Sequence, residues 1–172
     1  MPTHVLATPI GPLTLVASDA GLHEIRFPGG RRPAGDRPGD DSGPAGPAEP
    51  DHPVLVAAVT QLREYFAGER HDFDLPLAPR GTPFQLMAWR ALRSIPYAAT
   101  VSYGEQARRL GDPKKTRAVG AANGRNPIPI VIPCHRVVGA DGKLVGFGGG
   151  VETKAWLLDH ERRTAGETLD FG

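Results

Sequence analysis

A single cysteine, followed directly by a histidine and an arginine, is the feature of this sequence best suited to chemistry. Cys134 directly follows the apolar run 127–133, which contains three prolines, and directly precedes His135 and Arg136. A thiol reacts as its thiolate, and cationic or histidine neighbours favour that form, so the triplet could hold a tuned nucleophile. The apolar run predicts a buried strand that carries Cys134 to the edge of a core. A lone cysteine is more often an inert core residue, so the segment upstream must decide between the two interpretations.

That upstream segment has the pattern of a helix-turn-helix. Ser102 and Glu105 have the spacing of a capping box at the start of a first helix, which stops at Gly111. Asp112 and Pro113 restart a helix at once, because aspartate caps a helix and proline is tolerated at its first position. This second helix is predicted over roughly 113–123, closed by Gly124.

One face of the second predicted helix carries only small and cationic residues. Val119 lies roughly opposite and would anchor the helix on the core. Such a face lets a helix approach a nucleic-acid backbone closely, although alanine and glycine could also serve only close helix packing. The face consists of Lys114, Arg117, Ala118, Ala121, Gly124 and Arg125.

The charge distribution favours the nucleic-acid interpretation. The whole chain has a formal net charge of +1, but residues 1–79 have a net charge of −5 and residues 80–172 one of +6. A basic second half suits a phosphate backbone, and it surrounds both the predicted helix-turn-helix and the thiol. A solvated basic face without a partner would give the same net charge.

The motif Pro133-Cys134-His135-Arg136, preceded by Asn126-Pro127 and the helix-turn-helix, resembles the O6-alkylguanine-DNA alkyltransferases, or methylated-DNA–protein-cysteine methyltransferases. The resemblance runs from about Gly81 to Glu161, and more loosely through residues 8–13. It implies DNA repair by direct damage reversal, without a cofactor. A protein of this family flips O6-alkylguanine, and as a further substrate O4-alkylthymine, out of duplex DNA. A cysteine thiolate then takes the alkyl group irreversibly in one turnover.

The resemblance also implies roles for individual residues. Cys134 is the nucleophile, His135 its base through a bound water, and Glu161 the carboxylate that orients the histidine. Asn126 ties the helix-turn-helix to the active-site strand. By the residues alone, Glu161 could be an ordinary surface residue of a helix, and Asn126 an ordinary turn residue.

Further positions carry over to the DNA side of the site. Arg117 matches the arginine that fills the base stack, and Tyr103 the tyrosine whose hydroxyl serves the flipped base. The carbonyls of Cys134 and Val137 would accept from the guanine amine, and the amide of Gly148 would donate near O6. Without a functional role, Arg117 would be an exposed or phosphate-binding cation and Tyr103 an aromatic residue of the core.

The sequence departs from the family pattern at two places. Some members have a serine where Gly148 stands. A pocket wall with glycine at this position could admit bulkier alkyl groups than one with serine. Some members bind zinc through N-terminal cysteines, which this chain lacks, and the spacing of its N-terminal histidines suggests no metal. We therefore expect no metal. The histidines in question are His4, His23, His52 and His71.

The remaining pattern predicts an α+β protein with two domains, at 1–79 and 80–172. The first should hold a small antiparallel sheet and a helix over 54–66 that buries Leu55, Val59, Leu62 and Phe66. Residues 28–53, with 7 Pro and 6 Gly, predict a flexible loop. The second domain should be mostly helical, with a helix opened by Thr82-Pro83 and a last helix at about 151–163. Strands are expected at Val5–Thr8, Leu13–Ser18 and Leu22–Phe27; the helix opened by Thr82 should carry Phe84, Met87, Ala88, Ala91 and Ile95; and Asp141-Gly142 should form a hairpin turn.

Location and partners follow from the same reasoning. The sequence shows no apolar stretch of about 20 residues and no secretory signal, which favours the cytoplasm, with the protein on the nucleoid when bound to DNA. One cysteine excludes an internal disulfide. The expected partner is double-stranded DNA bearing O6-alkylguanine, bound by a monomer, with cooperative assembly along DNA left open. Two alternatives are a non-catalytic protein that binds alkylation lesions, in whose relatives the cysteine is replaced, and a cysteine hydrolase or redox sensor.

Overall fold

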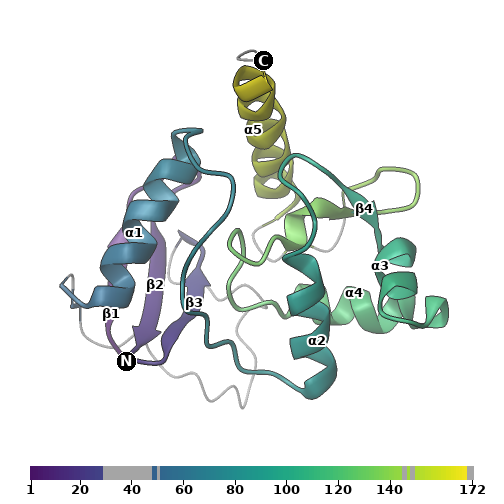
Figure 1. Ribbon diagram of the computed structural model, residues 1–172, viewed down its shortest axis with the longest axis horizontal. Helices are drawn as coiled ribbons and strands as arrows, with labels where there is room; N and C mark the ends of the chain where they lie inside the picture. Colours follow the sequence, from purple (N-terminus) through teal and green to yellow (C-terminus); the bar gives the residue numbers. More distant parts are fainter. Residues whose placement is uncertain (29–47, 50, 145–146, 148–149, 170–172) are drawn as a thin grey trace.

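The structure, a computed structural model, describes residues 1–28, 48–49, 51–144, 147 and 150–169, with side chains described as far as residue 165. A three-stranded antiparallel sheet with one covering helix forms the first part, and the second part is mostly helical (Figure 1). The α+β prediction is thus confirmed. In chain order the elements are β1 (Thr3–Leu6), β2 (Leu13–Ser18), β3 (Gly21–Arg26), α1 (Pro53–Phe66), α2 (Pro83–Leu92), β4 (Val101–Ser102), α3 (Tyr103–Arg109), the 3₁₀ turn η2 (Pro113–Lys115), α4 (Thr116–Gly124), the 3₁₀ turn η3 (Cys134–Arg136), β5 (Val137–Val138) and α5 (Val151–Leu169).

The sheet has the order β1-β2-β3, and its first strand lies earlier than expected. The sequence predicts that strand at Val5–Thr8, but β1 ends at Leu6 because Thr8 forms a turn. The amide of Gly11 donates to the Thr8 carbonyl, and the Thr8 hydroxyl donates to the Gly11 carbonyl. Gly11 has a φ of 101°, which glycine adopts without strain.

Helix α1 covers one face of the sheet, but its buried side is not quite the one expected. Leu55 and Leu62 are buried as predicted, whereas Val59 and Phe66 are only half-buried. Tyr65, which the sequence did not single out, is fully buried instead. The predicted loop 28–53 lies mostly outside the described residues.

Helix α2 also turns a different side to the core than expected. Thr82 caps it with a capping box, and Ala88 is buried as expected. Trp89 is buried as well, and its indole Nε1 donates to the Ala122 carbonyl at 2.7 Å, which packs α2 on α4. Met87 is consequently 44% exposed. The helix ends at Leu92, so buried Ile95 lies beyond it rather than on it.

Helices α3 and α4 form the predicted helix-turn-helix. Ser102 Oγ accepts from the amide of Glu105 at 3.0 Å, and the Asp112 carboxylate accepts from the amide of Lys114 at 2.9 Å. The restarted helix begins with one 3₁₀ turn, and the α-helix itself starts at Thr116. Val119 is fully buried, as its position opposite the small-residue face predicts.

The apolar run before the cysteine is buried but is not a strand. Residues 127–132 form turns and bends, and Ile130 has a φ of 75°. The strand prediction is wrong because the prolines at 127, 129 and 133 have no amide hydrogen to donate to a ladder. The segment is fastened from outside instead: the Ile25 amide of β3 donates to the Pro127 carbonyl at 3.0 Å.

The turn at Asp141-Gly142 forms, but the hairpin does not. The Gly139 amide donates to the Lys143 carbonyl at 2.8 Å, whereas residues 143 and 144 after the turn are not in a strand. Strand β5 instead pairs in parallel with β4, Val101 lying opposite Val137.

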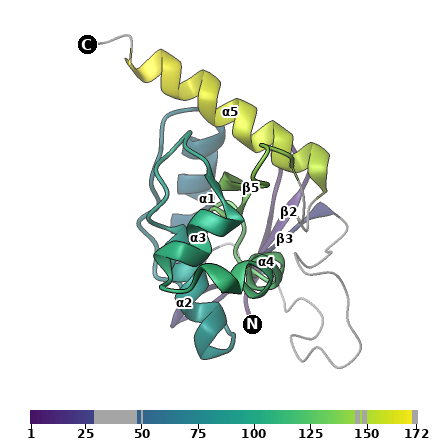
Figure 2. The same ribbon diagram turned by 90° about the vertical axis from the view of Figure 1, so that its right-hand side faces the viewer.

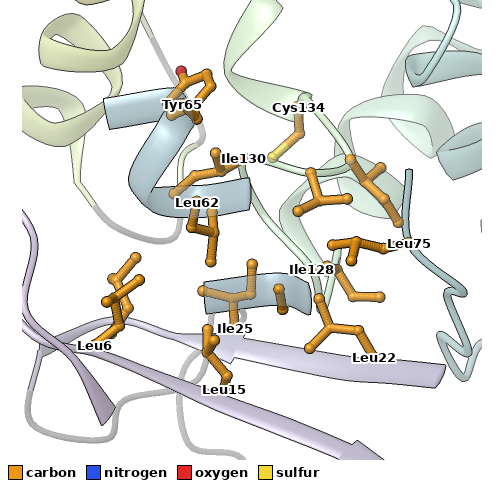
Figure 3. Packing of buried hydrophobic residues seen from close by; sticks show 14 of the residues in the cluster. Leu6, Leu15, Leu22, Ile25, Leu62, Tyr65, Leu75, Ile128, Ile130 and Cys134 are labelled. Carbon is orange, nitrogen blue, oxygen red and sulfur yellow. The ribbon is translucent and has the colours of Figure 1, made fainter. Parts of the chain in front are cut away.

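A single apolar core joins the two halves of the chain. Figure 3 shows leucines and isoleucines of the sheet and α1 packed against Ile128 and Ile130, with Cys134 at the edge. Helix α5 runs along one side of the molecule (Figure 2), and it extends to Leu169, beyond the predicted end at 163. The division into domains at 79/80 stays a prediction. No helix of the described part is long and apolar enough to cross a membrane.

Candidate active site

Cys134 begins the 3₁₀ turn η3 and is 7% exposed. Its amide donates to the Ile132 carbonyl at 2.8 Å, which fixes the backbone at the nucleophile. Burial raises the pKa of the Cys134 thiol, while a hydrogen bond with Asn126 and the charge of Lys154 act in the opposite direction. Burial prevails, so the free protein holds a protonated thiol. The expected thiolate therefore needs a base that takes the proton.

Asn126 is the hinge between α4 and the cysteine-bearing segment. Its side-chain Nδ2 donates to the Ile132 carbonyl at 2.7 Å, and its Oδ1 accepts from the Ile128 amide at 3.0 Å. The side chain is almost completely buried. The side-chain amide of Asn126 thus holds together the turns that lead from the helix-turn-helix to the thiol.

His135 and Glu161 form a buried pair next to the thiol. The distance from His135 Nε2 to Glu161 Oε2 is 2.6 Å, and neither side chain is exposed. Arg136 donates through Nε to Oε1 at 2.9 Å and through Nη2 to Oε2 at 3.1 Å. Burial alone would raise the pKa of Glu161, but the hydrogen bonds and charges of His135 and Arg136 outweigh it and hold that pKa well below its usual range. Glu161 is therefore a carboxylate.

The ionised carboxylate determines which nitrogen of His135 carries the proton. A carboxylate only accepts hydrogen bonds, so Nε2 must be the protonated nitrogen. Nδ1 then has the free lone pair, and in the described part of the chain it is the buried side-chain atom that lacks a hydrogen-bond partner. Burial lowers the pKa of His135 despite the opposing effect of Glu161, so the imidazole is neutral. It can therefore take a proton at Nδ1.

Two further residues bind the Glu161 carboxylate and a third lies near the thiol; none of the three was predicted from the sequence. The Tyr65 hydroxyl donates to Glu161 Oε2 at 2.7 Å, and the Ala98 amide donates to Oε1 at 3.1 Å. Lys154 is fully buried near Cys134, with its Nζ 5.7 Å from the centre of the Tyr103 ring. Only Lys154 had a signal in the sequence: it stands seven residues before Glu161, on the same face of the last helix. Tyr65 and Ala98 are too far from Glu161 in the chain for any local pattern.

Tyr103 lies between the thiol and the second helix of the motif. It is half-buried, and a side chain at Gly120 of α4 would come within 3.8 Å of its ring. Burial and the neighbouring Cys134 raise the pKa of Tyr103, so its hydroxyl keeps its proton. Val137, whose carbonyl was expected to serve the base, is buried at the start of β5. Gly148 lies outside the described residues.

The outer face of α4 has the predicted character. One amide pair fixes this helix on α3 through two hydrogen bonds: Gln106 Nε2 donates to Asn123 Oδ1 at 3.1 Å, and Asn123 Nδ2 donates to Gln106 Oε1 at 2.7 Å. The residues predicted to face DNA are exposed there, apart from half-buried Gly124. The exposed residues of this face are Lys114, Arg117, Ala118, Ala121 and Arg125. Within the described residues, no group of three or more His, Cys, Asp and Glu side chains could hold a metal ion.

Fold and site together define a class: proteins that pair a helix-turn-helix with a buried cysteine and a histidine–carboxylate pair. The comparisons with known proteins give the family. Residues 83–163 match the 6-O-methylguanine DNA methyltransferase, DNA binding domain, and residues 1–79 match the ribonuclease-like domain of the same methyltransferases. The chain belongs to the 6-O-methylguanine DNA methyltransferase family.

Individual relatives agree along almost the whole chain. A methylated-DNA–protein-cysteine methyltransferase of Methanosarcina acetivorans is 44% identical over 91% of this chain and 96% of its own. One of Mycolicibacterium paratuberculosis is 47% identical over 94% and 93%. Among solved structures, Mycobacterium tuberculosis OGT in complex with DNA has a TM-score of 0.82 and 44% identity, covering 95% of this chain and 94% of that one.

Proposed function

We propose that this protein repairs DNA by transferring the alkyl group of O6-alkylguanine irreversibly to Cys134. One observation carries the proposal: the only cysteine of the chain is followed by a histidine whose Nε2 is held by a carboxylate and whose Nδ1 has no hydrogen-bond partner among the described residues. The family to which the chain belongs supports it, because its curated relatives are named as methyltransferases that act from methylated DNA to a protein cysteine. O4-alkylthymine is proposed as a second substrate of the same chemistry.

The reaction is a single displacement. His135 takes the thiol proton of Cys134 at Nδ1, through one water molecule that would also satisfy this buried nitrogen. The thiolate sulfur then forms a bond to the alkyl carbon, and the bond between that carbon and guanine O6 breaks. The electron pair of the broken bond stays on the base, which accepts one proton and becomes guanine. The product is a thioether, so each protein molecule reacts once.

Glu161 and Asn126 prepare this step without touching the substrate. Because the carboxylate holds the proton of His135 on Nε2, the lone pair at Nδ1 stays available. A negative charge behind the ring also stabilises the imidazolium that forms. Asn126 offsets part of the effect of burial on the Cys134 thiol and fixes the turns around it.

The helix-turn-helix supplies the DNA contacts. The small, cationic face of α4 allows close approach to the duplex, and we assign Arg117 to the space in the base stack that the flipped nucleotide leaves. Lys114 and Arg125 are assigned to phosphates. Tyr103 has a protonated hydroxyl beside the thiol and is assigned to the flipped base, together with the carbonyls of Cys134 and Val137 and the amide of Gly148.

The partner and the place of action follow from the substrate. Double-stranded DNA is the partner, and the reaction is proposed to occur on the chromosome in the cytoplasm. A flipped base is served by one copy of the protein, so a monomer suffices.

Intact-mass measurement tests the proposal. The protein is incubated with duplex DNA that contains one O6-methylguanine, with Cys134→Ser as the control. We expect a gain of about 14 Da, one methylene, that stops at one per protein and is absent in the control. DNA binding without a mass gain would favour a non-catalytic lesion-binding protein. Neither binding nor gain would favour a cysteine hydrolase or redox sensor.

A further inference from the structure

Helix α1 of the N-terminal part contributes a side chain to the group behind the nucleophile. Tyr65 comes from the last turn of α1, 96 residues before Glu161, and its hydroxyl donates to Glu161 Oε2 at 2.7 Å. The side chain is fully buried. Figure 3 shows α1 with Leu62 and Tyr65 in the same core as Ile130 and Cys134.

The ring of Tyr65 is held firmly in place. It makes edge-on contacts with Phe66 and Tyr97, at 5.3 and 6.2 Å between ring centroids, and tilted contacts with Phe73 and His160 at 5.6 and 5.3 Å. The Tyr65 carbonyl also accepts from His160 Nε2 on α5, at 2.8 Å. A ring confined on several sides directs its hydroxyl to one point, and that point is the carboxylate.

The oxygen that Tyr65 contacts is the same one that binds His135. Glu161 Oε2 receives the Tyr65 hydroxyl and His135 Nε2, at 2.7 and 2.6 Å. Arg136 Nη2 is the third donor to this oxygen, at 3.1 Å. Donors on one oxygen share its negative charge, so each weakens the hydrogen bonds of the others. We propose that Tyr65 is a positioning residue of the alkyl-transfer site, which fixes the Glu161 carboxylate and weakens its attraction for the His135 proton. The inference rests on the proposed function, in which His135 and Glu161 act on Cys134.

The hydroxyl serves as a donor at every pH at which the protein would work. Burial and the negative charge of Glu161 raise the pKa of Tyr65 far above its ordinary value, and Glu161, being ionised, can only accept. The other titratable or charged groups around this pair come from two elements and one loop. They are Tyr97 in the loop after α2, His135 and Arg136 of η3, and Lys154 and His160 of α5. Cys134 directly precedes His135, and the charge of Lys154 acts on its thiol.

Removing the hydroxyl should change both the rate and its pH dependence. In Tyr65→Phe, His135 shares Oε2 with Arg136 alone, so the imidazole binds a proton more tightly and takes it from Cys134 more readily. Only the neutral imidazole can take the thiol proton, so the pH of half-maximal transfer on the acid side should move up. The maximal rate should nevertheless fall about tenfold, a fraction of what a positioned acid–base group contributes, because the carboxylate loses one of its anchors.

The experiment measures single-turnover alkyl transfer from duplex DNA with one O6-methylguanine between pH 5 and pH 9, together with DNA affinity. Tyr97→Phe is the matched control, because it removes a hydroxyl from a neighbouring ring that bonds Thr164 and not the carboxylate. We expect the slower rate and the shifted profile in Tyr65→Phe alone, with unchanged DNA affinity in both variants. Equal rates and profiles in the two variants would overturn the inference, since loss of packing alone does not move a pH profile.

A second substitution keeps the test decisive if Tyr65→Phe folds poorly. Incorporating 3-fluorotyrosine at position 65 preserves the shape and the hydroxyl but makes it a stronger donor. The acid side of the profile should then move in the opposite direction, to lower pH; no shift would overturn the inference. Failure of the wild type to alkylate Cys134 would instead contradict the proposed function, so the two failures are distinguishable.

Discussion

Glu161 is the residue on which the site is built, because groups from across the chain converge on its two oxygens. His135 and Tyr65 share Oε2 with one nitrogen of Arg136, while Ala98 and the other nitrogen share Oε1. A buried carboxylate is stable only when its charge and lone pairs are satisfied in this way. Several distant parts of the chain must therefore hold fixed positions around the Glu161 side chain.

Ala98 shows the strain that this arrangement imposes. Its φ of 65° is in the left-handed region, and that conformation lets its amide donate to Glu161 Oε1 at 3.1 Å. The left-handed conformation costs a residue with a Cβ roughly 1–2 kcal/mol, a cost that glycine avoids.

Ala98→Gly should therefore stabilise the protein. Glycine loses more conformational entropy on folding, which offsets part of the relief, so the expected net gain in unfolding free energy is up to about 1 kcal/mol. Urea denaturation measures it, with Ala99→Gly as the control, since Ala99 has no positive φ and its substitution should destabilise. If both substitutions lower the midpoint equally, the left-handed conformation at 98 is not costly.

At the scale of elements, the orientation of α4 depends on a buried amide pair. Gln106 of α3 and Asn123 of α4 exchange two hydrogen bonds, and both side chains are buried. Each amide satisfies the other, so neither helix can turn without exposing an unpaired polar group to the core.

Asn123→Leu should lower the unfolding free energy by about 1–3 kcal/mol, because it leaves the Gln106 amide buried without its partner. The double variant Gln106→Leu/Asn123→Leu should recover most of that loss, since replacing both partners by apolar groups removes the unsatisfied group. A double-mutant cycle by urea denaturation measures the coupling, and DNA affinity reports the orientation of α4. A double variant less stable than Asn123→Leu would contradict the assignment.

The ends of the helices and the contacts of single residues differ in how far the sequence could predict them. Helix starts at Ser102 and Thr82 were predictable because a cap is a local pattern of side chain and backbone. The run 127–133 was misread because an apolar run signals burial, which is correct, but not strand geometry, which its prolines prevent. At the site, Cys134, His135 and Asn126 stand close together in one motif. Tyr65 and Ala98 reach Glu161 only through tertiary packing, and no local spacing encodes such contacts.

At the scale of the whole molecule, the two halves share both their core and the group behind the thiol. The Ile25 amide of strand β3 donates to the Pro127 carbonyl in the cysteine-bearing segment. With Tyr65 bound to Glu161, the N-terminal part supports the site directly. Disturbing the charges of the site should therefore weaken the fold as a whole.

Acid provides such a disturbance, and its sign follows from the directions of two pKa shifts. Burial lowers the pKa of His135 below its ordinary value of 6.5, so below that pH the unfolded chain binds a proton that the folded protein does not. The pKa of Glu161, lowered by His135 and Arg136 against the effect of burial, does the same below 4.5. In both windows the unfolded state binds more protons, so stability falls as the pH falls.

The unfolding free energy should thus decrease below about pH 6.5, with a contribution from His135 of at most about 1.4 kcal/mol per pH unit, the value for one proton. Urea denaturation followed by circular dichroism from pH 8 to pH 5 measures the slope. His135→Gln should flatten it in this range, whereas His4→Gln, which removes a histidine of β1 outside the site, should leave it unchanged. The core is common to both halves, so the transition should stay a single step at each pH. An unaltered slope in His135→Gln would mean that the neutral imidazole is not what ties stability to pH.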